Sequence, residues 1–224
     1  MPIDVRRYAA LAGMAAAALV FGIAAHGITR SWQEGRQERA VTAHAEQVYH
    51  SPTSFVAGNP NGDVSVVAFF DHNCPYCRRD APSLVKLTEN DAQVRLVLKE
   101  LPVLGPDSEA VAKVALAAAR QGKYFELYQR LFASSGPANE AKALRIAGEL
   151  GLDEAKLKRD MQDPAIAATL AENERLAQNL KVRGVPFYIV GGKIPREGSG
   201  DFYADLTRLV AEARAAKQQA ESSR

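Results

Sequence analysis

The stretch VSVVAFFDHNCPYC, residues 64–77, decides the fold. Its first half, Val64–Phe70, is apolar and rich in β-branched residues, as is typical of a short buried strand. A helix should begin at Pro75, because proline lacks the N–H that would be unsatisfied at the first helical position. Apolar residues alternate over 94–98 and predict a second strand. A strand, a helix and a second strand in this order imply a parallel pair joined by a right-handed crossover.

The rest of the chain predicts a block of helices and then a return to the sheet. Caps and apolar stripes at helical spacing place helices within 107–181. A strand at Phe187–Val190, a Gly-Gly turn and a short strand at Lys193–Pro195 precede a last helix from Asp201. The predicted class is α/β, in the order βαβ, helices, ββα.

The composition excludes several classes of protein. The 224 residues include 28 Lys and Arg against 26 Asp and Glu, a formal net charge of +2. No field strong enough to hold nucleic acid is expected, so we predict no nucleic-acid partner. At 47% hydrophobic residues the chain is not disordered as a whole. Its two cysteines are too few for a multi-disulfide scaffold or a four-cysteine zinc site.

Residues 1–30 predict export as a signal peptide or a membrane anchor. Arg6 and Arg7 precede residues 8–29, which contain no Asp, Glu, Lys or Arg. A helix of about 20 residues spans about 30 Å, the thickness of a bilayer core. Arginines on the N-terminal flank favour the cytoplasm for that end and the periplasm for the rest of the chain. An uncleaved segment would tether the protein to the inner membrane.

The exported part divides at a turn cluster over residues 58–62. Residues 31–57 before it predict a polar helical spacer, too short in heptads for a coiled coil, with a subunit-docking arm as the alternative. The globular domain is predicted over 58–218, and a polar, frayed tail over 219–224.

The chemistry of the chain centres on the tetrapeptide Cys74-Pro75-Tyr76-Cys77. A ring closed between these two cysteines is too small to be an effective structural staple, and it suits a bond that is made and broken. At a helix N-terminus Cys74 faces unsatisfied N–H groups and the positive end of the helix dipole, which favour the nucleophilic thiolate. Cys77, one turn further along, should be shielded and act as the resolving thiol. Cations close in sequence that could assist Cys74 are His72, Arg78 and Arg79.

Two thiols can also bind metal. Structural zinc would need two further ligands, and the four histidines do not supply a partner pair at the required spacing. Transient capture of Cu(I) by two soft thiolates is chemically reasonable, so a periplasmic copper-handling protein is the competing function. For the oxidoreductase we expect neither a cofactor nor a metal.

Three separated segments carry a family resemblance. Residues 69–77, FFDHNCPYC, resemble the active-site segment of exported thiol–disulfide oxidoreductases of the DsbA kind. Residues 99–108, KELPVLGPDS, and the tripeptide at 184–186, GVP, are similar to segments common in bacterial relatives. The resemblance implies a thioredoxin fold with an all-helical domain inserted between its βαβ and ββα halves.

The resemblance also implies the site residues and the activity. Cys74 and Cys77 would be the redox pair, flanked by Pro75, Tyr76 and His72. Pro186 would be cis beside the cysteines, and Val185 would pair its backbone with an extended substrate chain. The substrates would be unfolded or partly folded cysteine-containing proteins, oxidised by the enzyme, which a membrane redox partner would recycle. Disulfide isomerisation or reduction is the alternative direction.

The chain departs from its relatives at two places. Many relatives have a buried acid just before the Phe-Phe pair, where it handles protons for the inner cysteine, whereas this chain has Ala68. Proton handling would then fall to Glu100, Lys99, Asp71 or water. The segment 195–200, PREGSG, also differs from the apolar Pro-Gly turn expected before the last helix.

Overall fold

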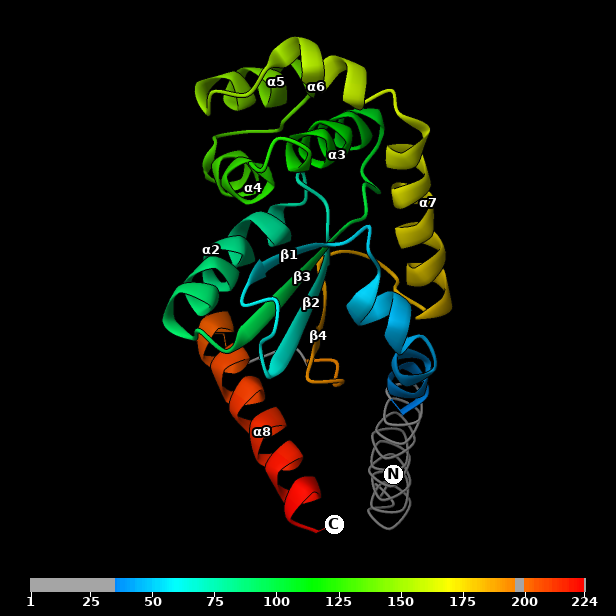
Figure 1. The fold of residues 1–224 in the computed structure, drawn as a ribbon, viewed down its shortest axis with the longest axis vertical. Helices are drawn as coiled ribbons and strands as arrows, with labels where there is room; N and C mark the ends of the chain where they lie inside the picture. The colour runs from blue at the N-terminus through cyan, green and yellow to red at the C-terminus, as the bar shows by residue number, and fades with distance from the viewer. Residues whose placement is uncertain (1–34, 196–199, 224) are drawn as a thin grey trace, which may run out of the picture.

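A computed structural model describes residues 35–195 and 200–223, and its centre is a mixed four-stranded sheet (Figure 1). The strand order is β1-β3-β2-β4. The strands are β1 (Phe55–Gly58), β2 (Val64–Phe70), β3 (Val94–Glu100) and β4 (Phe187–Val190). The inner pair β2 and β3 is parallel, and β1 and β4 flank it as antiparallel neighbours.

The predicted βαβ unit is confirmed. Helix α2 (Pro75–Asn90) connects β2 to β3, whose register runs from Val64 opposite Val94 to Phe70 opposite Glu100. Both strands are buried on both faces, and β2 accordingly consists of a nearly continuous apolar run, whereas β3 also includes Arg95, Lys99 and Glu100. The carboxyl end of β2 therefore delivers the chain directly to the start of α2.

Five helices follow β3 before the chain returns to the sheet. They are α3 (Pro106–Ala119), α4 (Tyr124–Ala133), α5 (Glu140–Glu149), α6 (Glu154–Asp160) and α7 (Pro164–Asn179). The side chains of Asn139, Asp153 and Asp163 cap the last three, each accepting a backbone N–H of the first turn. The N-cap of α3 is Gly105, two residues before Asp107 and three before Ser108, where the cap was expected. Figure 1 shows α3 to α6 stacked over one end of the sheet, with α7 running back along it.

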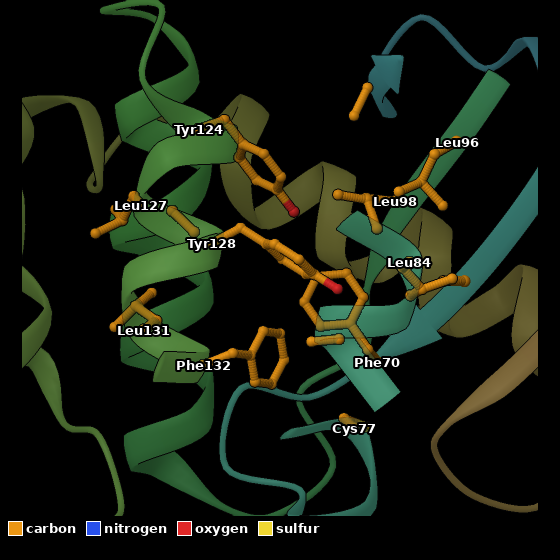
Figure 2. Packing of buried hydrophobic residues seen from close by; sticks show 14 of the residues in the cluster. Phe70, Cys77, Leu84, Leu96, Leu98, Tyr124, Leu127, Tyr128, Leu131 and Phe132 are labelled. Carbon is orange, nitrogen blue, oxygen red and sulfur yellow. The ribbon is translucent and has the colours of Figure 1, made fainter. Parts of the chain in front are cut away.

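Each face of the sheet is covered by helices. Helices α2 and α8 (Phe202–Ser222) lie on one face, and their apolar residues join those of β2, β3 and the helical layer in one large core. Figure 2 shows the part of this core where Tyr124, Tyr128 and Phe132 of α4 reach toward Phe70 and Cys77. On the opposite face α7 and the N-terminal helices cover a smaller core around Phe69, Val97 and Ile189.

The predicted spacer is wrong for the part of it that the structure describes. A helix over residues 35–43 and the π-helix η1 (Glu46–His50) pack on the sheet, and Val41 and Val48 are fully buried there. Their spacing of seven residues puts both side chains on one helix face, which here meets the sheet. Strand β1 ends at Gly58, so the boundary predicted at that residue separates a strand from its own sheet.

Two predictions near the C-terminus are also corrected. Residues 193–195 form a single bridge, Val190 with Lys193, because Pro195 has no N–H to continue a ladder. The turn before it needs glycine: Gly191 has φ +54, and a Cβ there would lie 2.3 Å from that of Ala213. The tail predicted as frayed from residue 219 continues α8 to Ser222, because Gln, Ala and Glu favour helix.

The predicted leader, residues 1–30, lies outside the described residues. Within 35–195 and 200–223, no helix combines the length and the apolar character needed to cross a bilayer. Most of the segment 195–200 likewise lies outside the described part of the chain.

Candidate active site at the start of helix α2

Four residues, 71–74, join β2 to α2, and the buried carboxylate of Asp71 organises this turn. One oxygen of Asp71 accepts the N–H of Asn73 at 2.8 Å. The other accepts the N–H groups of Val103 and Leu104 at 2.9 and 3.0 Å. Asp71 therefore fixes the turn before Cys74 against the loop after β3. The position of Cys74 thus depends on both of these segments.

Two further side chains tie this turn to the helical layer. The amide of Asn73 donates to Ser108 Oγ and to the carbonyl of Ala138, and its oxygen accepts the N–H of Ala138 at 2.7 Å. The guanidinium of Arg78 donates to the carbonyls of Leu131, Phe132, Ser134, Gly136 and His72. Arg78 thus binds the C-terminal end of α4 and does not serve as the cation beside Cys74 that the sequence suggested.

Cys74 is the N-cap residue of α2, as Pro75 predicted. Its backbone is extended, with φ −72° and ψ 121°, and its Sγ accepts the N–H of Cys77 at 3.3 Å. A donor that points at the sulfur stabilises negative charge on it. Both cysteines are free thiols and both are buried.

Cys77 lies in the first turn of α2, on its inner side. Burial raises the pKa of the Cys77 thiol, and the hydrogen bond with Cys74 raises it further. Figure 2 shows Phe70, Tyr128 and Phe132 on the inner side of Cys77. The shielding expected for this sulfur is therefore present, and Cys77 is held as a neutral thiol.

The tripeptide at residues 184–186, which is far from the cysteines in sequence, lies next to Cys74 in the structure. The Val185–Pro186 peptide bond is cis, as the resemblance implied. Cys74 Sγ donates to the carbonyl of Val185 across 3.4 Å, and β4 begins directly after Pro186. The structure therefore brings together Cys74, Cys77 and Val185, three of the residues that the sequence proposed for the site.

His72 takes part in a buried polar group behind the turn. Its Nε2 lies 3.0 Å from Glu100 Oε1, which also accepts the hydroxyl of Tyr124 at 2.7 Å. Burial, together with the charge of Glu100, raises the pKa of Tyr124, so this hydroxyl remains a donor. The ring of His72 packs against Phe70 and Phe132. His72 therefore links the turn to the end of β3.

Lys99 lies on the opposite face of the sheet from Glu100, as alternation along β3 requires. Its Nζ donates to the carbonyl of Gln47 and to Ser54 Oγ at 2.8 and 2.7 Å, and burial lowers its pKa to about 8. Lys99 attaches the N-terminal segment to the sheet and is remote from the thiols.

Sequence reasoning missed Asp80 and Tyr188. Asp80 is only 3% exposed, and its carboxylate accepts the hydroxyl of Tyr188 at 3.2 Å. Beside it opens a cavity of about 620 Å³ whose lining includes Tyr76 and Arg79. Tyr76 itself is 62% exposed, with the Arg79 guanidinium 5.3 Å from its ring centroid. The one available signal was an acidic residue three positions after Cys77, on the buried side of a helix.

The arrangement can carry out thiol–disulfide exchange. The Cys74 sulfur lies at the N-terminus of α2 beside the backbone of Val185, and the Cys77 sulfur follows three residues further along the helix. Among the described residues no group of three or more His, Cys, Asp or Glu side chains could hold a metal ion.

Comparison with known proteins agrees with this geometry. The family profile described as "DSBA-like thioredoxin domain" matches residues 65–208. A thioredoxin-like oxidoreductase from Silicibacter pomeroyi DSS-3 is 43% identical, with a TM-score of 0.71 over 76% of this chain and 97% of that chain. The thiol-disulfide exchange protein alpha-DsbA2 from Wolbachia pipientis is 26% identical, with a TM-score of 0.73 over 80% of this chain and 96% of that one.

A further similarity is to part of a much longer protein. The Na(+)/H(+) antiporter NhaA 3 of Salinispora tropica is 31% identical over 140 residues, which is 62% of this chain. The match spans only 22% of the length of that relative. The similarity therefore concerns about a fifth of the antiporter and not the antiporter as a whole.

Proposed function

Because this chain belongs to the family of DSBA-like thioredoxin domains and is a thiol:disulfide oxidoreductase, we propose that Cys74 and Cys77 are its redox pair and that it mainly oxidises dithiols. The observation that carries the proposal is the position of Cys74. Its sulfur caps α2, accepts the N–H of Cys77 and lies beside the carbonyl of Val185. The sulfur proposed as the nucleophile thus lies beside both the residue that carries the resolving thiol and the backbone that would face the substrate.

Oxidation of a substrate proceeds through a mixed disulfide. A substrate thiolate attacks Cys74 in the Cys74–Cys77 disulfide, and Cys77 leaves as a thiolate that takes up a proton. A second substrate thiolate then attacks the substrate sulfur, and Cys74 leaves. The substrate has lost two electrons and two protons, and the enzyme dithiol has gained them. In the reducing direction Cys77 attacks Cys74 in the mixed disulfide, and the substrate leaves as a thiol.

Oxidation is the favoured direction because the reduced enzyme is the stabilised form. The N–H of Cys77 and the N-terminal end of α2 stabilise Cys74 most when its sulfur carries negative charge, which is absent in a disulfide. About 30 mV in reduction potential corresponds to about 1.4 kcal/mol for this two-electron couple. A modest stabilisation of the thiolate therefore shifts the exchange measurably toward oxidised substrate.

Unfolded or partly folded proteins are the substrate class. Val185 and Pro186 present backbone beside Cys74, where an extended chain can pair with it. Three large apolar side chains in the two segments that Asp71 organises are exposed: Tyr76 at 62%, Val103 at 53% and Leu104 at 53%. Exposed apolar side chains of this kind suit the apolar residues that a folded substrate would bury.

The periplasm is the proposed compartment, because residues 8–29 are apolar and follow Arg6 and Arg7. If this leader is retained, it tethers the enzyme to the inner membrane. Reoxidation of the Cys74–Cys77 dithiol after each turnover requires an acceptor, for which a membrane redox protein is the proposed partner.

The test combines activity with an equilibrium. The full chain should catalyse oxidation of a reduced, unfolded protein with several cysteines in the presence of glutathione disulfide, and Cys74→Ser should abolish this. Equilibration with glutathione should give a potential well above that of a reductant. A potential near about −270 mV would overturn the proposed direction. Tight Cu(I) binding by the reduced protein without any dithiol turnover would overturn the enzyme in favour of a copper-handling protein.

A further inference from the structure

A buried carboxylate lies next to the inner thiol on α2. Asp80 follows Cys77 by three residues, and both side chains are buried, so they occupy neighbouring positions on one face of the helix. One carboxylate oxygen accepts from Arg79 Nε at 2.7 Å and the other from the Tyr188 hydroxyl at 3.2 Å. Burial of an ionisable group is costly, and such groups are concentrated at functional sites.

Tyr188 connects this carboxylate to the surroundings of Cys77. It lies on β4 opposite Ala68, on the sheet face that packs against Cys77. Burial raises the pKa of Tyr188, and the charges of Asp80 and Cys77 raise it further. Its hydroxyl is therefore protonated and donates to Asp80, and Tyr188 and Cys77 belong to the same buried cluster. A hydroxyl can donate one proton while accepting another, so it can pass a proton between two neighbours.

Asp80 lines a cavity, whereas Cys77 is not among the lining residues of that cavity. The cavity of about 620 Å³ beside Tyr76 is lined by Asp80, Arg79 and Tyr188. The Arg79 side chain that contacts Asp80 is largely exposed. On its inner side Cys77 is closed off by the aromatic residues of α4. Asp80 is thus next to the inner thiol on α2 and also lines this cavity.

Cys77 needs such a group because burial raises the pKa of its thiol, yet only its thiolate can attack. The other acids near β2 and β3 are engaged elsewhere. Asp71, whose charge also raises the pKa of Cys77, has both oxygens bound by backbone N–H groups. Glu100 holds His72 and Tyr124 behind the turn through Oε1, and its Oε2 is buried without a hydrogen-bond partner among the described residues.

From this juxtaposition we infer that Asp80 is the positioning residue that handles the proton of Cys77, through the hydroxyl of Tyr188; the inference rests on the proposed function. When Cys77 attacks the Cys74 sulfur of a mixed disulfide, its proton passes to Asp80. The Cys77–Cys74 bond forms, the bond from Cys74 to the substrate sulfur breaks, and the substrate leaves as a thiolate. In the opposite direction Asp80 returns a proton to the departing Cys77.

The pH dependence of this step belongs to a defined set of groups. Asp80 is faced by Arg79 and Tyr76 on α2, Tyr188 on β4, Tyr128 on α4 and Asp205 on α8. Cys77 is faced by Cys74, Asp71, Tyr128 and Tyr188. Phenols and guanidinium groups keep their protons near neutral pH, so carboxylates and thiols dominate the profile there.

The experiment separates the two chemical steps. Reduced full-length protein is mixed with glutathione disulfide, acid-quenched at intervals and analysed by mass spectrometry. The mixed disulfide on Cys74 reports the first step, and its conversion to the Cys74–Cys77 disulfide reports attack by Cys77. In Asp80→Asn we expect the second step to slow ~10- to 100-fold near pH 6, with the difference shrinking as pH rises toward about 9. The first step should stay unchanged, and Tyr188→Phe should show the same pH-dependent loss.

Controls distinguish proton transfer from structure and from charge. Asp80→Glu should recover most of the rate, and Glu89→Gln, an exposed acid on the same helix, should not alter it. A second step that is unchanged or faster near pH 6 in Asp80→Asn, or slowed equally at every pH, would overturn the inference. If Asp80→Asn does not fold, Tyr188→Phe decides on the same readout. Absence of exchange in the unmodified protein would instead refute the proposed function.

Discussion

The backbone N–H of Cys77 donates to the sulfur of Cys74 across 3.3 Å, so these two residues interact even when no disulfide joins them. This hydrogen bond uses the main chain of Cys77, whereas the hydrogen bond with Cys74 that raises the pKa of Cys77 uses its side chain. Stabilisation of the outer sulfur and attack by the inner sulfur are therefore separable properties of one residue.

Cys77→Ala should separate them. The variant keeps the N–H, so alkylation of Cys74 by iodoacetamide should stay within about two-fold of the unmodified rate at each pH. It lacks the resolving thiol, so a mixed disulfide with a thiol substrate should persist and be recovered on non-reducing gels. An alkylation rate that falls to that of free cysteine would show that the N–H does not act on Cys74.

Exposed apolar side chains beside the site predict a difference between protein and small substrates. Replacing both Val103 and Leu104 with Ser removes two side chains that are each 53% exposed. Partial burial of two such side chains contributes on the order of 1–2 kcal/mol, so KM for an unfolded protein should rise about 10-fold. The reaction with glutathione disulfide should be unchanged, because glutathione is too small to cover both residues. An equal loss with both substrates would indicate distortion of the Asp71 turn.

Arg78 predicts a loss of stability, not of chemistry. Its guanidinium bonds several carbonyls around the end of α4, and Ala there would leave them without that donor. Hydrogen bonds to charged groups contribute about 1.5–3 kcal/mol, so Arg78→Ala should lower the free energy of unfolding by on the order of 3 kcal/mol in urea. Arg145→Gln, which breaks an exposed pair with Glu149, should cost less than about 1 kcal/mol. Similar losses in both variants would contradict the assigned role of Arg78.

The local sequence was enough to predict those elements whose structure depends on residues close together in the chain. The apolar run at 64–70 and Pro75 predicted the β2-to-α2 turn, and Asp163 with Pro164 predicted the start of α7. The docking of residues 35–50 was missed, because two buried valines in a polar helix give too weak a pattern. Strand β1 was missed because it has only four residues and relies on pairing with β3.

The site divides in the same way. Cys74 and Cys77 are three positions apart and could be proposed from their spacing, and Pro186 from a short motif. The role of Asp80 depends on Tyr188, 108 positions further along the chain, and no local pattern links the two. Glu100 and Lys99 are neighbours in sequence, yet alternation along β3 sends their side chains to opposite faces. From the sequence alone, both were candidates to carry protons for Cys77. In the structure Glu100 contacts His72 and Tyr124, and Lys99 binds the N-terminal segment.

Lys99 finally predicts a pH dependence of stability. Burial lowers its pKa to about 8, whereas an unfolded lysine titrates near about 10.4. Between these values the unfolded chain binds one more proton than the folded chain, so the free energy of unfolding should rise with pH from about 8 to about 10. Lys99→Met lacks this proton, so the stability of the unmodified protein relative to Lys99→Met should increase by on the order of 2 kcal/mol over that range. Urea denaturation of both proteins at each pH measures this difference in stability directly, because every other titrating group is common to both. A difference that stays constant with pH would show that Lys99 is not held in a desolvated state by Gln47 and Ser54.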